Sequence, residues 1–572
     1  MHQFALRIHA PYIIYSLMFL ASFAAGDGAL NWNVYIKQFA FGVAFAAMIA
    51  ISIFLSPRDK QIRIMWGDVL VAALFAVYLI FFVGTDNHLD FTQPFIAFLF
   101  YVFIRTMEGD KPEGAVQVLC RIVPFMILLH LVCCALQFFR IIPSFHGFFQ
   151  VGSTFGNPDM LGAYLAVLSP FCYVGNGRKT FGIIVLCLTV ILLLMIQART
   201  AIVAIAVAGI LYLLLSGKLS MRRFLIWILF PAIAGLALLV WWHPASVVGR
   251  LFVWWISLNM FVSRPAGWGL YAFEKHYPEF QTEYIASHNI PEIFNPDVVH
   301  SPFNEFLNIG VTLGVVGLLI FLLLVAYILN TAFKTKSQLV YPACAFLVVS
   351  MTYFPLSIVP VSMMGIVLSA LVISHCPSRS LASIRFGMTR CLLALVMIVI
   401  VALTCYNYQV YHKWQIAVDN KNDGNNAGFE KIYPALKGNG RFLITWARER
   451  DLAGDSIRSL SLMKEAELFF CDNIFLRNMA LLCERNEQPE EAKILFDKAV
   501  NMAPCQFNTA YDRILFLQRI GCYEEAYQAA VKLYQQPIRS KYYADPFIIK
   551  SRLKKLIQSY SKQDESCIEK NI

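Results

Sequence analysis

Residues 242–304 form a polar segment, WHPASVVGRLFVWWISLNMFVSRPAGWGLYAFEKHYPEFQTEYIASHNIPEIFNPDVVHSPFN, between two long apolar runs. The second run follows at once over residues 305–330, EFLNIGVTLGVVGLLIFLLLVAYILN. An apolar helix of that length crosses a hydrocarbon core of about 30 Å, so the polar segment must lie at one membrane surface. Its arginines, histidines and aromatic rings suit it to bind a lipid-linked anion at that surface.

The composition indicates a membrane protein over most of the chain. Of its 572 residues, 58% are hydrophobic and 15% are charged, whereas a soluble protein carries roughly a quarter charged residues. We therefore predict an all-α, polytopic helical bundle whose first span is retained and not cleaved as a signal peptide. The formal net charge of +11 lies mostly in short loops between spans. We therefore predict no nucleic-acid partner.

The apolar runs predict about thirteen membrane spans. Basic connections follow the even-numbered spans, which predicts that the N-terminus and these connections are cytoplasmic. We then predict that three segments lie on the opposite, non-cytoplasmic side of the membrane: the loops at 139–159 and 243–304, and the chain beyond residue 410. The predicted spans are 11–26, 34–56, 66–84, 91–107, 117–138, 160–175, 180–197, 200–216, 224–242, 305–330, 339–355, 357–375 and 391–410.

The C-terminal region has the spacing of a helical repeat. On a 34-residue tetratricopeptide grid over residues 473–504, the positions that require small, aromatic, small and proline residues are Ala492, Phe496, Ala499 and Pro504. Such a solenoid either docks a protein partner or acceptor, or forms a lid that stabilises the outer loops. The predicted domains are a transmembrane domain over 1–410, a linker over 411–429 and a repeat domain over 430–572.

Three arginines are candidate anion ligands. Arg199 lies at the end of an apolar span, where it either binds an anion or snorkels to the interface. Arg250 begins a segment with helical apolar spacing, and we predict that this segment is an amphipathic helix on the membrane surface. Arg250 would lie near the N-terminus of that helix, where main-chain N–H groups also attract anions. Arg264 is either a phosphate contact or a turn residue, and Trp254 either anchors the helix in the membrane or contacts a sugar.

His300 is the candidate general base, because it precedes a span on the predicted outer face. A structural role is the alternative, and His276 and His288 lie deeper in the loop. Asn157 and Asn304 stand where spans begin and are candidates for shaping the site. The outer loops carry no clustered carboxylates or paired histidines, so we predict no catalytic metal.

Three segments resemble the O-antigen ligase and polymerase superfamily of bacterial membrane glycosyltransferases. They are GSTFGNPDMLGAYLAVLSPF, GRLFVWWISLNMFVSRPAGWGLYAF and HSPFNEFLNIGVTLGVVGLLIFLL, and the resemblance covers roughly 150–325. This chain has Phe303 where many relatives have a histidine directly before the asparagine. It also has Thr312 where an acidic residue is common.

The resemblance implies a GT-C-like bundle in the bacterial inner membrane, with the outer domains in the periplasm. It implies an inverting, metal-independent transfer without a cofactor, from a glycan on undecaprenyl pyrophosphate. Arg199, Arg250 and Arg264 would then hold the pyrophosphate, and His300 would deprotonate the acceptor hydroxyl. The acceptor is lipid A-core in a ligase, a second lipid-linked glycan in a polymerase, or Ser or Thr in a protein O-oligosaccharyltransferase. A transporter of lipid-linked sugars is the alternative of another class, and it predicts charged pairs near the bilayer midplane.

Overall fold

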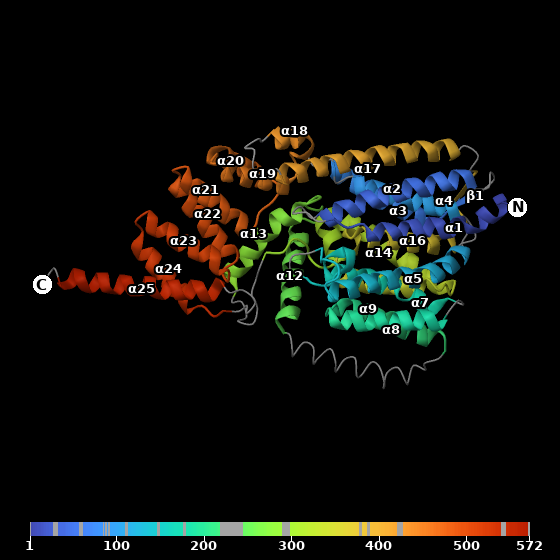
Figure 1. Cartoon of the computed structure of the whole chain (residues 1–572), viewed down its shortest axis with the longest axis horizontal. Coiled ribbons are helices and arrows are strands. Elements are labelled where there is room, and N and C mark those ends of the chain that lie inside the picture. The colour runs from blue at the N-terminus through green and yellow to red at the C-terminus, as the bar shows by residue number, and fades with distance from the viewer. Residues whose placement is uncertain are drawn as a thin grey trace. The chain divides into compact units, whose positions relative to one another are not determined.

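The computed structural model forms an almost entirely helical protein that divides into two compact units (Figure 1). The bundle unit comprises Met1–Pro231, Phe303–Asn420 and Glu430–Ala435, and the loop unit comprises Ala232–Pro302, Lys421–Phe429 and Leu436–Ile572. The residues that the structure describes are 2–26, 32–55, 61–83, 85, 89, 92–108, 113–145, 149–175, 179–217, 244–288, 298–376, 380–385, 389–419, 427–538 and 545–569.

The bundle unit confirms the predicted polytopic helical membrane protein. Twelve of the thirteen predicted spans coincide with helices, and the ninth, 224–242, lies outside the described residues. Within the described residues, five helices reach the length and hydropathy of a full span, and others are shorter and apolar. The helices are α1 (His2–Leu20), α2 (Trp32–Leu55), α3 (Trp66–Val83), α4 (Thr92–Glu108), α5 (Glu113–Phe138), α6 (Pro158–Leu168), α7 (Phe171–Val174), α8 (Lys179–Met195), α9 (Arg199–Leu215), α14 (Glu305–Lys334), α15 (Val340–Thr352), α16 (Val359–Ser374) and α17 (Thr389–Asp419), with short 3₁₀ turns η1 (Ala21–Phe23), η3 (Ser153–Phe155) and η5 (Pro355–Ser357).

Helix α17 runs nine residues past the predicted span end at residue 410. Tyr411, Trp414 and Val418 are buried at helical spacing, which explains why the helix continues. Residues 411–419, the first part of the predicted linker, are therefore helical, and residues 420–426 lie outside the described part of the chain.

A two-stranded sheet joins two of the basic connections. Strand β1 (Gln61–Ile64) pairs antiparallel with β2 (Ala382–Arg385), with Gln61 opposite Arg385. The connections after the second and the twelfth predicted span therefore meet at the same end of the bundle. The loop charges predict that both share one side of the membrane. That this side is cytoplasmic stays a prediction.

A buried ion pair closes this end of the bundle. Arg105, in the last turn of α4, donates from Nε to Asp68 Oδ1 at 2.7 Å and from Nη2 to Asp68 Oδ2 at 2.9 Å. Its remaining donors reach Ser374 Oγ of α16 and the main-chain oxygen of Arg63. Asp68 also accepts from the hydroxyl of Tyr101 at 2.6 Å. The pair thus connects α3, α4, α16 and β1.

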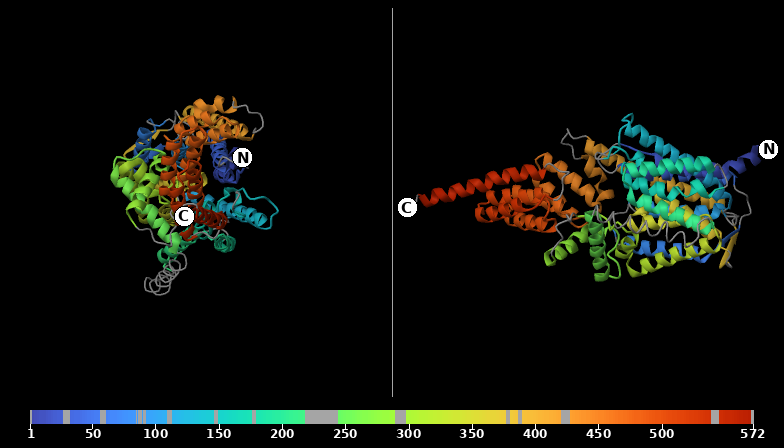
Figure 2. Two further views of the ribbon diagram at one scale, coloured as in Figure 1. Left: turned by 90° about the vertical axis from the view of Figure 1, so that its left-hand side faces the viewer. Right: turned by 90° about the horizontal axis from the view of Figure 1, so that it is seen from below.

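The loop unit contains two helices of the polar segment and the C-terminal helices. From the polar segment come α12 (Pro244–Ser263) and α13 (Ala272–Ser287). Three helical hairpins follow, shown in orange to red in Figures 1 and 2. Their first helices begin at Gly440, Asn473 and Phe507, in steps of 33 and 34 residues. The hairpins are α19 (Gly440–Leu452) with α20 (Ser456–Ala466), α21 (Asn473–Arg485) with α22 (Pro489–Met502), and α23 (Phe507–Arg519) with α24 (Tyr523–Gln535), followed by α25 (Asp545–Glu569). Helix α18 (Ala427–Leu436) precedes them in the chain, and its residues Glu430–Ala435 belong to the bundle unit.

The hairpins pack through the residues that the repeat grid singled out. Ala492, Phe496 and Ala499 are fully buried in α22, and small residues there let two helices approach closely. The period agrees with the predicted repeat, while the tetratricopeptide assignment itself stays a prediction.

Helix α13 of the polar segment packs against α22 of the repeats. Gln281 is fully buried, and its Nε2 donates to the main-chain oxygen of Met502 at 3.1 Å. Tyr277, one turn earlier, is also fully buried. This contact favours the interpretation of the repeats as an element that stabilises the outer loop.

Candidate functional site

Helix α12 carries Arg250 and Trp254 one turn apart, so both lie on one side of the helix. The helix confirms the predicted helical segment. It leaves an apolar stripe exposed at helical spacing, formed by Leu251, Trp255, Leu258 and Val262. Such a stripe is expected on a helix that lies in a membrane interface.

Arg264 lies just beyond the end of α12 and is exposed. Its guanidinium lies 5.4 Å from the ring centroid of Trp268, within the range of a cation–π contact. The indole of Trp268 donates to the main-chain oxygen of Met260 at 2.8 Å. The turn therefore has a defined conformation that holds the Arg264 side chain against an aromatic face.

His300 faces a carboxylate of α13. Its Nδ1 lies 3.8 Å from Oε1 of Glu274, and its ring stacks on that of Phe470 at a centroid distance of 5.7 Å. The same Oε1 accepts from Nη2 of Arg441 at 2.7 Å. The His300 side chain is 46% exposed, so its imidazole stays accessible to a substrate hydroxyl.

Asn304 begins α14 as its N-cap. Its Oδ1 accepts from the main-chain N–H groups of Phe306 and Leu307, and its Nδ2 donates to the main-chain oxygen of Met351 at 3.0 Å. The following residue, Glu305, is buried and accepts from the N–H of Leu356 at 3.2 Å. The start of α14 is thereby fixed to the connection between α15 and α16.

Further along α14, Gly314 has φ 68° and ψ −168°, which interrupts the regular helix. A positive φ is readily adopted only by glycine. Gly314 lies in the third segment that resembles the family, so the sequence alone could have pointed to this position.

Asn157 caps α6, because its Oδ1 accepts from the N–H of Asp159 at 2.8 Å. The preceding turn is held by buried polar side chains. Gln137 of α5 accepts from the N–H of Ser153 at 2.7 Å, and His130 lies 2.9 Å from the hydroxyl of Ser153. The side chain of Lys37 in α2 donates to two main-chain oxygens that follow α1. Asn157 therefore occupies a helix-start turn that α5 holds rigidly.

Arg199 is the first residue of α9 and is exposed. In the part of the chain that the structure describes, no ion pair or hydrogen bond is formed by its guanidinium. The N–H groups of a helix N-terminus attract anions. Arg199 thus joins an accessible guanidinium to the positive end of a 17-residue helix.

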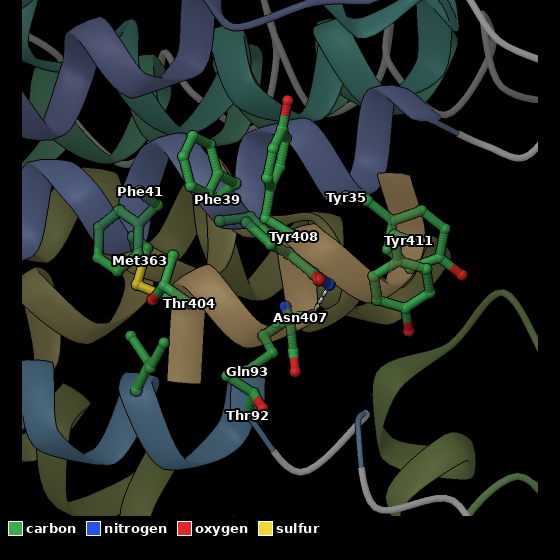
Figure 3. A pocket seen from close by; sticks show the side chains of 13 residues that line it. Tyr35, Phe39, Phe41, Thr92, Gln93, Met363, Thr404, Asn407, Tyr408 and Tyr411 are labelled. Atoms are coloured by element: carbon green, nitrogen blue, oxygen red, sulfur yellow. Dashed lines mark hydrogen bonds between the residues drawn. The ribbon is translucent and has the colours of Figure 1, made fainter. Parts of the chain in front are cut away.

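A small pocket in the bundle unit is lined by α2, α4, α16 and α17 (Figure 3). Tyr35 stacks on Tyr411 with centroids 3.7 Å apart, and Asn407 donates to the main-chain oxygen of Leu89. The pocket volume is about 30 Å³, which is enough to hold a water molecule. It holds no charged side chain, and its buried Thr404 hydroxyl has no partner in the described structure. The pocket can therefore hold a water molecule that hydrogen-bonds to Thr404.

The predicted residues fall into both units. Arg250, Trp254, Arg264 and His300 belong to the loop unit, and Arg199, Asn157 and Asn304 belong to the bundle unit. The structure adds Glu274 and Arg441, which the sequence did not single out. They lie 26 and 141 positions from His300 in the chain, so no local pattern could connect them to it.

These features define a polytopic helical membrane protein with a basic, aromatic polar segment between spans. Residues 183–322 match the family model described as O-antigen ligase. This match, which covers about a quarter of the chain, supports the O-antigen ligase superfamily and, in general terms, a membrane glycosyltransferase activity of the ligase or polymerase type. The family implies a lipid-linked glycan donor and a lipid acceptor in general terms. A search of curated proteins found no match.

Proposed function

We propose that this protein is an O-antigen ligase-type glycosyltransferase. It transfers a glycan from undecaprenyl pyrophosphate to a hydroxyl of lipid A-core at the periplasmic face of the inner membrane. The observation that carries the proposal is the family match over residues 183–322. That single match spans Arg199, Arg250, Arg264 and His300, the candidate residues chosen for their charge and chemistry.

The proposed reaction is a direct displacement with inversion. The acceptor oxygen attacks the anomeric carbon while the bond from that carbon to the pyrophosphate oxygen breaks. The acceptor proton passes to Nε2 of His300, and the electron pair of the broken bond stays on the departing pyrophosphate. The sugar arrives already activated on the lipid, so the mechanism needs no nucleotide cofactor and no metal.

The three arginines bind and neutralise the pyrophosphate in this proposal. A guanidinium can donate two parallel hydrogen bonds to a phosphate. The exposed guanidinium of Arg199 at the α9 N-terminus, and the contact of Arg264 with Trp268, support this role. Charge that develops on the leaving group is then stabilised by groups already in place. Trp254, Asn157 and Asn304 shape the surroundings.

The test is a transfer assay with purified protein in lipid nanodiscs. R199A, R250A and H300A should each reduce transfer by at least about 100-fold, the usual effect of removing a general base or a charge-stabilising donor. Two exposed residues, His288 and Arg140, supply the matched controls H288A and R140A, which should keep normal rates. Normal transfer by R199A, R250A and H300A would refute the mechanism.

The acceptor is tested separately in a deletion strain. Loss of long lipopolysaccharide with intact glycoproteins supports the ligase, and loss of glycoproteins alone supports a protein O-oligosaccharyltransferase. Shortened free polymer supports a polymerase. The repeats favour the protein O-oligosaccharyltransferase slightly, because helical solenoids offer concave surfaces that bind partners. The transporter alternative predicts charged pairs near the bilayer midplane. The Asp68–Arg105 pair does not support it, because Asp68 lies in the first turn of α3 and Arg105 in the last turn of α4.

A further inference from the structure

The contact between His300 and Glu274 has the arrangement of an oriented base. Glu274 lies in the first turn of α13, and its Oε1 is 3.8 Å from Nδ1 of His300. A carboxylate at Nδ1 favours the tautomer with its proton on that nitrogen, which leaves Nε2 free to accept a proton. The stacked ring of Phe470 restricts the rotation of the imidazole further.

Glu274 is itself held by the C-terminal repeats. Arg441, the second residue of α19, donates to Oε1 of Glu274 at 2.7 Å. The main-chain N–H of Cys471 donates to the main-chain oxygen of Glu274 at 3.4 Å. Both contacts come from the repeat hairpins, so these hairpins fix the position of the carboxylate from its side chain and its main chain.

The groups around His300 form one chain of contacts. Among the described residues, Glu274 faces His300 directly, Arg441 acts through Glu274, and Phe470 is uncharged. Burial raises the pKa of the adjacent Cys471 thiol to about 12, so it stays neutral. Other charges around that thiol are Glu279, Glu467, Asp472 and Lys498.

We propose that Glu274 is a positioning residue for the base His300, and that Arg441 of the C-terminal repeats holds the Glu274 carboxylate in place. The inference rests on the proposed function for the role of His300 as base. It gives the repeats a direct part in the chemistry, beyond packing against α13. It also supplies the carboxylate partner that a lone, half-exposed histidine would lack.

The test compares E274Q and R441Q in the full-length protein in nanodiscs. The tautomer of His300 is read from the NMR shifts of its two labelled ring nitrogens, with H300Q to assign the signals. In the wild type the proton of the neutral ring should reside on Nδ1, and E274Q should reduce the share of that tautomer. R441Q, which releases the Glu274 side chain, should have a smaller effect in the same direction.

Matched controls lie on the same two helices. Glu279 of α13 contacts His276 and not His300, and Arg448 of α19 is exposed. E279Q and R448Q should leave the His300 tautomer and the rate of transfer unchanged. A loss of fold would alter the signals of all histidines, so it is distinguishable from a change confined to His300.

The transfer assay gives the second measurement. E274Q should lower kcat about threefold to tenfold with little change in KM, and R441Q should lower it less. A normal kcat and an unchanged His300 tautomer in E274Q would overturn the inference. A changed tautomer in E274Q together with normal transfer by H300A would retain the cluster and refute the proposed function instead.

Discussion

Removal of the Asp68 carboxylate should destabilise the bundle unit more than removal of both members of its ion pair. The D68N variant leaves the Arg105 guanidinium buried with a positive charge and no counterion. The Arg105 side chain is 6% exposed and the Asp68 side chain 18% exposed. Breaking a buried pair by removal of one partner costs about 3–5 kcal/mol.

We expect the lower end of that range, about 3 kcal/mol, for D68N. Arg105 would still donate to Ser374 Oγ and to the main-chain oxygen of Arg63. In the double variant D68N/R105M no uncompensated charge remains, so its cost should fall to about 1 kcal/mol. The stabilities should therefore follow the order wild type, double variant, D68N.

The assay is unfolding of the purified protein by SDS in mixed micelles. A protein with two units need not unfold in one step, so the order of the midpoints is the quantity compared. E113Q, which alters an exposed carboxylate at the start of α5, serves as the control and should match the wild type. An unchanged midpoint in D68N, or a double variant as unstable as D68N, would refute the reasoning.

Three further predictions concern packing, capping and charge. G182A should cost about 1–3 kcal/mol, since the added Cβ would lie 2.0 Å from the main-chain oxygen of Cys172; G209A, which meets nothing within 4 Å, should be neutral or stabilising in the same unfolding assay. N304A should cost about 1 kcal/mol through loss of the α14 cap, and N304S, which keeps a capping oxygen, should recover most of it. The hydrogen bond from Lys493 and the charge of Arg513 lower the pKa of Glu525, so this carboxylate stabilises the repeats above its ordinary pKa and the gain is lost as the pH falls below it. Because the Glu525 side chain is 38% exposed, the effect should be a few tenths of a kcal/mol, and the melting temperature of E525Q should fall less between pH 7 and pH 4 than that of the wild type.

The membrane helices could be predicted from the sequence because a span is a local property. The predicted span 66–84 differs from the observed α3, Trp66–Val83, by one residue. Helix α17 contains the predicted span 391–410 and runs nine residues past it, since the amphipathic spacing of Tyr411, Trp414 and Val418 continues the helix after the apolar run has ended.

The contacts around the candidate base could not be predicted in the same way. His300 was singled out by its place before a span, but its partners depend on how α13 packs against the repeats. Arg441 and Glu274 are 167 positions apart in the chain. Neither residue stands in a distinctive local pattern. Only the packing of distant helices brings a carboxylate and a guanidinium to the same imidazole.

The contact between Gln281 and Met502 sets the order of events during biosynthesis. These residues are 221 positions apart, so α13 leaves the ribosome long before α22 exists. At about 5–20 residues per second, that interval lasts on the order of 10–40 s. Through this time the surface of α13 that includes Tyr277 and Gln281 has no repeat to cover it. Helix α13 therefore reaches its packed state only after the C-terminal repeats have been synthesised and folded.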